Sequence, residues 1–273
     1  MKILLLDPEQ KVPHRISKDT SGGYGTGNDF GDSLIPNFLK RTLKLIHDWP
    51  PLFAAYSMSV LKKNGHEVLY SKNFPKNHED FDLYVVVSSI VCCETECEFV
   101  EKLSKMKKKI LVIGPFATNN PKKYIEAGAS VVLGEPEFYF LKNKNLDEIK
   151  KNEKIIFTHD FDLDDLPYPD WENIINNNKT SLLFGNEKSL PILATRGCPY
   201  SCFKYCVYPL QQGRKPRHRT AKNIVDELEF WNKKFKVKMF IFRDPVFSIN
   251  KKHTLEFCEE LIQRKINIKF IIE

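Results

Sequence analysis

Short apolar segments alternate with longer amphipathic segments over the first half of this 273-residue chain. The inner positions of segments 82–88 and 109–114 are apolar without interruption, which is typical of strands covered on both faces of a sheet. The pattern predicts strands at 2–7, 66–70, 82–88, 109–114 and 130–134, with helices at 51–63, 92–107 and 121–127. Strands and helices in alternation predict a doubly wound parallel sheet over residues 1–140.

Small and polar residues follow the predicted strands. Ser88-Ser89, Gly114-Pro115 and the segment 134–137 each stand directly after a strand. Because parallel sheets of this type bind ligands beyond the carboxyl ends of their strands, we expect a binding site at this edge. A glycine-rich segment at 21–31 holds five of the 12 glycines, and the sequence favours neither a ligand loop nor an ordinary surface loop there.

The character of the sequence changes after the predicted sheet. Residues 141–189 are polar and marked by prolines, which indicates a linker. An apolar run at 190–194 then opens a second pattern of strands and helices. We predict helices at 221–234 and 252–264 and strands at 237–242 and 266–272. Thr220 is a suitable N-cap for the first of these helices.

Three cysteines, Cys198, Cys202 and Cys206, lie within nine residues directly after the apolar run. Three thiolates on one short loop can hold three irons of a cubic iron–sulfur cluster and leave the fourth iron open to a ligand. Two other interpretations stay open: one buried face of a helix, and a zinc site, although no neighbouring cysteine or histidine supplies the usual fourth zinc ligand. A disulfide is not expected, because seven cysteines is an odd count in a chain without a secretory signal.

The segment 195–202, Thr-Arg-Gly-Cys-Pro-Tyr-Ser-Cys, with Tyr205-Cys206 after it, resembles the start of the radical S-adenosylmethionine (SAM) enzymes. The family usually has three and then two residues between its cysteines, whereas this chain has three and three. The resemblance implies that Cys198, Cys202 and Cys206 hold a [4Fe-4S] cluster. The open iron of that cluster would bind the amino and carboxylate groups of SAM.

The same resemblance implies further site residues. Tyr205 matches the aromatic position that packs near the adenine of SAM. Asp244 follows a predicted strand at the place where the family binds the SAM amino group. Arg217 and Arg219 are candidates for neutralising the SAM carboxylate or a substrate anion, although exposed arginines in a basic loop usually do neither.

The first half of the chain resembles the cobalamin-binding domain that precedes the radical SAM barrel in one branch of that superfamily. The resemblance rests on the segments 50–52, 62–68, 88–89, 114–115 and 134–137. It implies that Ser88, Ser89 and Gly114 line the corrin and its nucleotide tail. The Asp-x-His-x-x-Gly motif that supplies a histidine to cobalt in many cobalamin proteins is absent, so cobalamin would lack a ligand from that motif.

The expected fold class is α/β. A Rossmann-like doubly wound parallel sheet of the B12-binding type is expected over 1–140, a linker over 141–189, and the first half of a radical SAM partial (β/α) barrel over 190–273. The resemblance implies more barrel strands than the sequence shows, so we expect a chain truncated within the barrel.

The expected function is reductive cleavage of SAM to a 5′-deoxyadenosyl radical, with cobalamin, on an unidentified small-molecule substrate that is methylated or rearranged. One alternative is a truncated, non-catalytic module that binds cobalamin and an iron–sulfur cluster. The other is a zinc-stabilised RNA-binding protein. The resemblance also implies an electron donor such as flavodoxin or ferredoxin.

The chain carries 42 Lys and Arg against 35 Asp and Glu, a formal net charge of +7. Lysine-rich segments such as 105–109 and 233–238 carry much of this charge, and no basic stripe with interleaved aromatic residues stands out, so nucleic-acid binding is not indicated. No apolar run approaches the length of a membrane span, and the first run ends at Asp7-Pro8, too early for a signal peptide. We therefore expect a cytoplasmic enzyme.

Overall fold

The computed structural model describes residues 1–273 apart from 9–32, 37, 39–51, 76–80, 157–160, 179–182, 185–186, 201, 203–205, 207 and 273. The described residues form a six-stranded parallel sheet, named the first sheet below, with the strand order β2-β1-β3-β4-β5-β6. Its strands are β1 (Lys2–Leu6), β2 (Glu67–Ser71), β3 (Leu83–Val87), β4 (Ile110–Ile113), β5 (Ser130–Leu133) and β6 (Lys154–Ile156). The predicted α/β class with a doubly wound parallel sheet is confirmed.

Alternation along the strands divides the core of the first sheet into two faces. Val85 and Val87 of β3 pack with α2 (Leu52–Lys63) and α6 (Pro136–Lys142). Tyr84 and Val86 pack on the other face with α3 (Cys93–Lys105), α4 (Pro115–Asn119) and α5 (Pro121–Glu126). Because helices cover both faces, β3 is buried along its whole length, as its uninterrupted apolar sequence predicts.

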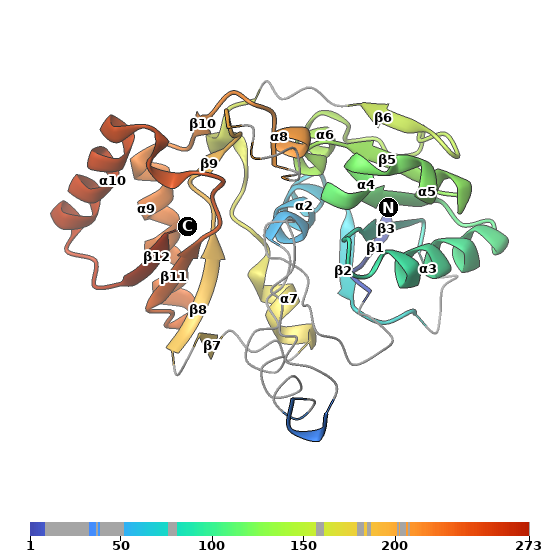
Figure 1. Ribbon diagram of the computed structural model, residues 1–273, viewed down its shortest axis with the longest axis horizontal. Coiled ribbons are helices and arrows are strands. Elements are labelled where there is room, and N and C mark those ends of the chain that lie inside the picture. Colours follow the sequence, from blue (N-terminus) through green and yellow to red (C-terminus); the bar gives the residue numbers. More distant parts are fainter. Residues whose placement is uncertain are drawn as a thin grey trace.

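A second sheet has the order β12-β11-β8-β7. Its strands are β7 (Leu183–Phe184), β8 (Glu187–Ile192), β11 (Met239–Phe242) and β12 (Lys269–Ile272). β11 pairs in parallel with both β8 and β12, and α9 (Ala221–Phe235) and α10 (Lys251–Arg264) lie between these strands in the chain. This β-α-β-α-β order is the expected beginning of a (β/α) barrel. In Figure 1 the second sheet lies on the left, the first sheet on the right, and α2 between them.

The helices of the second half begin at suitable capping residues. Thr220 Oγ1 accepts a hydrogen bond from Asn223 N at 3.2 Å, and Asn250 Oδ1 accepts one from His253 N at 3.3 Å. The N-cap predicted at Thr220 is therefore present. α9, with 15 residues, is the longest helix of the described part of the chain, and none of the described helices combines the length and apolar character needed to cross a membrane.

Several short elements were not predicted. β6 pairs with β5 inside the segment assigned to the linker, and α7 (Trp171–Asn178) lies there too. The other unpredicted helices are α4, α6 and α8 (Tyr208–Gln212), together with short turns of 3₁₀-helix at Leu163–Asp165 and Phe247–Ile249. These elements are too short to show a clear hydrophobic period. The linker is nevertheless packed, because Trp171 is fully buried and Asp170 N donates to Ala55 O of α2 at 3.0 Å.

A buried arginine joins the two halves of the chain. Arg219 is 2% exposed, and its Nη1 lies 2.6 Å from Glu227 Oε2 of α9 and donates to Leu193 O at 2.8 Å. The same nitrogen donates to the hydroxyl of Tyr56 on α2 at 3.3 Å. Burial raises the pKa of Glu227, and the charge of Arg219 opposes that rise. The expectation of an exposed Arg219 was wrong, because α2 and α9 cover a residue that the sequence places in a basic loop.

Replacing Arg219 with Met should lower the free energy of unfolding by about 3–5 kcal/mol, because Glu227 would stay buried without its counter-ion. The matched control is Lys233→Met, which removes the exposed ion pair with Glu229 and should cost less than about 1 kcal/mol. Urea denaturation followed by circular dichroism measures both changes. Equal losses in the two variants would show that the buried pair does not stabilise the fold.

Candidate functional site

The three cysteines of the candidate cluster motif lie in a loop that follows the carboxyl end of β8. This loop, residues 197–216, is named the cysteine loop. β9 (Thr195–Arg196) precedes it and β10 (Arg217–His218) follows it, and the two pair antiparallel, with Arg196 opposite Arg217. Its root is therefore a two-stranded ribbon, which lies above the second sheet in Figure 1, whereas α8 lies beside α6 in that view.

The thiols differ in exposure. Cys198 is buried, Cys202 is exposed and Cys206 is half-buried. None of these three residues lies in a described helix, which disfavours the interpretation as one buried helix face. Within the described residues no three Cys, His, Asp or Glu side chains are close enough together to hold a metal ion. Tyr205, the predicted adenine contact, lies outside the described residues.

Asp244 fastens the start of the ribbon to the end of β11. Its carboxylate is 3% exposed, and Oδ1 accepts hydrogen bonds from Ala194 N at 2.8 Å and from Thr195 N. Burial raises the pKa of Asp244 to about 7, although the two amides oppose the rise. Oδ2 accepts no hydrogen bond from the described residues. Asp244 thus holds the chain just before the cysteines and keeps one acceptor oxygen unused.

Glycine is the only residue type that fits position 197 of the loop. Its φ is +85°, and a Cβ there would lie 2.3 Å from Lys215 O. The amide of Gly197 donates to Gln212 Oε1 at 3.2 Å, and Cys198 N donates to Gly213 O at 3.1 Å. The first cysteine is therefore fixed by the chain that returns after the last one.

The predicted corrin-lining residues come together at the carboxyl ends of β3 and β4. Gly114 has a φ of +109°, and a Cβ there would lie 3.0 Å from Ser88 Oγ and 3.1 Å from the ring of Phe53. Ser88 Oγ accepts from Ala117 N at 2.9 Å, and Ser89 Oγ donates to buried Glu96 Oε1 at 3.0 Å. Both hydroxyls are thus used inside the protein. They shape the edge of the first sheet.

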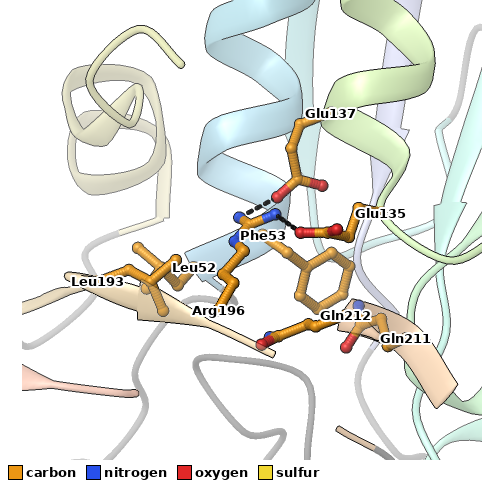
Figure 2. Close-up of a pocket in the computed structure, with 8 residues that line it drawn as sticks. All are labelled: Leu52, Phe53, Glu135, Glu137, Leu193, Arg196, Gln211 and Gln212. Atoms are coloured by element: carbon orange, nitrogen blue, oxygen red, sulfur yellow. Dashed lines mark hydrogen bonds and ion pairs between the residues drawn. The ribbon is translucent and has the colours of Figure 1, made fainter. Parts of the chain in front are cut away.

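The edge of the first sheet meets the cysteine loop. α8, which follows the last cysteine, packs against α4, which follows Gly114. A cavity of about 10 Å³ lies between the halves. Figure 2 shows its lining residues, with Arg196 reaching the carboxylates of Glu135 and Glu137 after β5. Its lining residues are Leu52, Phe53, Glu135, Glu137, Leu193, Arg196, Gln211 and Gln212. The two candidate sites are therefore neighbours.

Sequence reasoning assigned no individual role to Glu135, Glu137, Arg196 and Gln212, although all four line the cavity at this junction. Arg217, which we expected to be exposed, has a side chain only 10% exposed and pairs with Glu135. One signal was present in the sequence. Two glutamates flank a proline directly after a buried strand. A carboxylate that is buried at such a place needs a positively charged partner.

Comparisons with known proteins agree with this arrangement. No family model matches the chain. The chain is 37% identical to the anaerobic magnesium-protoporphyrin IX monomethyl ester cyclase of Rubrivivax gelatinosus over 37% of its length and 18% of the relative. It is 26% identical to the cyclase of that name from Cereibacter sphaeroides, over 84% of this chain and 43% of the relative. The bacteriochlorophyllide d C-8(2)-methyltransferase of Chlorobaculum tepidum is 26% identical over 67% of this chain and 42% of the relative.

Two solved structures share the fold. The cobalamin-dependent SAM radical enzyme OxsB, solved with aqua-cobalamin and SAM, matches 98% of this chain and 38% of its own, with a TM-score of 0.65 and 15% identity. The radical SAM methyltransferase TsrM from Kitasatospora setae, solved with cobalamin and a [4Fe-4S] cluster, matches 97% of this chain and 52% of its own, with a TM-score of 0.58 and 13% identity. The chain thus spans less than half the length of the curated relatives and about half or less of these structures.

The raised pKa of Asp244 predicts a pH dependence of stability. The pKa is about 7 in the folded protein against an ordinary value of 3.8, so the folded state holds this proton more tightly. The contribution to stability is therefore present below pH 4 and is lost as the pH rises towards 7. The side chain of Asn in Asp244→Asn does not titrate. Between pH 4 and 8 the free energy of unfolding of this variant should therefore rise relative to that of the unmodified chain, by up to about 4 kcal/mol. Urea denaturation across this range tests it, and an unchanged difference would contradict it.

Proposed function

We propose that this chain, which is similar to radical SAM enzymes that carry a cobalamin-binding domain, holds a [4Fe-4S] cluster and cleaves SAM reductively, with cobalamin as a second cofactor. The observation that carries the proposal is the position of the cysteine loop. Three thiols follow the carboxyl end of β8, and the loop root packs against the edge of the first sheet. Two cofactors bound there would face each other across one junction.

The residues of the loop suit a cluster. Cys198, Cys202 and Cys206 would each bind one iron, and thiolates are the usual ligands of such clusters. A cluster held by these thiols and reduced by an external donor would supply the one electron that cleaves a sulfur–carbon bond of SAM, giving methionine and a 5′-deoxyadenosyl radical able to abstract hydrogen. Gly197 and Gln212 hold the first cysteine in place for this, while Cys202 stays at the surface for assembly.

Asp244 would receive the amino group of SAM. The support is its buried Oδ2, which accepts no hydrogen bond from the described residues and belongs to a side chain already fixed beside the loop root. An ammonium group would satisfy this oxygen and stabilise its charge. The packing of Tyr205 against the adenine is part of the same proposal.

The edge of the first sheet would receive cobalamin. Gly114 is buried and leaves this edge without a side chain where a Cβ would meet Ser88 and Phe53. The hydroxyls of Ser88 and Ser89 bond inward, so these two side chains also keep the edge small. Ligands of doubly wound sheets bind beyond these strand ends. Cobalamin would act there as a methyl donor or an electron relay. The substrate would be a small molecule, and the electrons would come from a cytoplasmic donor such as flavodoxin or ferredoxin.

A second candidate is a binding module that holds both cofactors without turnover. The described second sheet leaves Phe270 and Ile272 of β12 exposed by 39% and 43%, so part of its apolar surface has no cover among the described residues. Anaerobic formation of 5′-deoxyadenosine under a strong reductant separates the candidates. Turnover by this chain supports the enzyme, and bound cofactors without turnover support the module.

The cluster assignment predicts that Cys198, Cys202 and Cys206 act as a unit. Changing any one to Ala should remove most of the iron and sulfide, because each thiolate holds one iron. The matched control is Cys258→Ala, a half-buried cysteine on α10 that should leave both contents unchanged. Iron, sulfide and the visible spectrum are measured after anaerobic reconstitution. A Cys202→Ala protein with full iron content, or an unmodified protein that binds only colourless zinc, would contradict the assignment.

The cobalamin assignment predicts that Gly114→Ala weakens cobalamin binding about tenfold or more, a loss of about 1.4 kcal/mol. The reason is that the new Cβ would displace Ser88 and Phe53 at the sheet edge. The matched control is Gly65→Ala, since Gly65 also has a positive φ but no atom within 4 Å of the new Cβ. Titration with hydroxocobalamin measures affinity, and iron content should stay unchanged in both variants. Equal affinities in the two variants would argue against this site.

A further inference from the structure

The guanidinium of Arg196 is buried between two carboxylates from the other half of the chain. Its side chain is 4% exposed, Nη1 donates to Glu135 Oε1 at 2.7 Å, and Nη2 donates to Glu137 Oε1 (Figure 2). Arg196 stands two residues before Cys198, whereas the glutamates follow β5 of the first sheet. One side chain therefore ties the start of the cysteine loop to the first sheet.

The end of the loop is tied to the same carboxylate. Arg217 Nη2 lies 2.5 Å from Glu135 Oε2 and also donates to Gln212 O at 2.9 Å. Because Arg196 and Arg217 stand opposite each other in the ribbon, Glu135 binds both strands of the loop root. The ring of Phe138 lies 5.6 Å from the Arg196 guanidinium and 5.8 Å from that of Arg217, so an apolar wall covers the group.

These four side chains form a group whose formal charges cancel. Burial raises the pKa of Glu137, and the charge of Arg196 opposes the rise. Burial alone would lower the pKa of Arg196, but the two carboxylates raise it above its ordinary value. A buried charge that loses its partner is costly, so each member depends on the others staying in place. This group of Glu135, Glu137, Arg196 and Arg217, named the joint, therefore resists small displacements of the loop root.

We propose that Glu135 and Glu137 are positioning residues that hold the cysteine loop, through Arg196 and Arg217, at a set distance from the edge of the first sheet. The inference rests on the proposed function, in which the loop carries the cluster and the edge receives cobalamin. Its consequence is that the first sheet, which would bind cobalamin, also fixes the position of the loop that would bind the cluster. Loosening the joint leaves each cofactor bound and uncouples the two.

Hydrogen exchange of the full chain without cofactors tests the joint directly. Glu137→Gln keeps the shape of the side chain and removes its charge, and Arg196→Lys keeps the charge but loses the fork that reaches both carboxylates. Both variants should increase amide exchange in residues 195–213 about tenfold or more, as expected for a broken buried pair. The control is Glu172→Gln, which breaks the exposed pair with Lys234 and should change nothing in that segment.

A second measurement separates positioning from general stability. In the reconstituted protein, hydroxocobalamin should slow the removal of iron by a chelator, because the loop is held against the occupied edge. Glu137→Gln should keep its iron content and lose this protection. Unchanged exchange in residues 195–213, or a uniform rise along the whole chain, would overturn the proposal. An unmodified chain that binds neither cofactor would count against the proposed function instead, and the exchange result would still decide the inference.

Discussion

The pairing of one buried guanidinium with two buried carboxylates links the halves of this protein. Arg196 has to meet both Glu135 and Glu137, because none of these charges is accessible to water. The requirement sets which edges of the two sheets face each other. The carboxyl end of β5 in the first sheet must lie beside the carboxyl end of β8 in the second. The two edges proposed to bind the cofactors consequently lie at the same junction.

The cysteine loop combines a fixed root with thiols that differ in exposure. Asp244 accepts hydrogen bonds from the amides at the start of the ribbon, and Gly197 allows the close approach of Lys215 O. Cys202, in the middle of the motif, remains exposed. A root held in this way would reduce the conformational entropy lost if the proposed cluster assembled in the loop.

The elements predicted with greatest accuracy are those with a strong local pattern. The buried strands β3 and β4 were found within one residue at each end, and the helices α9 and α10 within one residue as well. The family resemblance, which rested on the cysteine motif and the strand-end residues, is confirmed by the comparisons. The unpredicted α4, α6 and α8 have only five to seven residues, too few for a hydrophobic period, and are stabilised by packing against distant segments.

The sequence by itself determined the α/β class, the parallel first sheet and the family resemblance, because hydrophobic period and residue spacing are local properties. It also determined which three thiols are candidates for the cluster. Only the tertiary structure decided that Arg217 and Arg219 are buried, that the hydroxyls of Ser88 and Ser89 bond inward, and that Asp244 binds the loop root. The burial and partners of these side chains depend on segments up to 163 residues away in the sequence, as for Tyr56 and Arg219. A local sequence pattern does not predict contacts between residues so far apart.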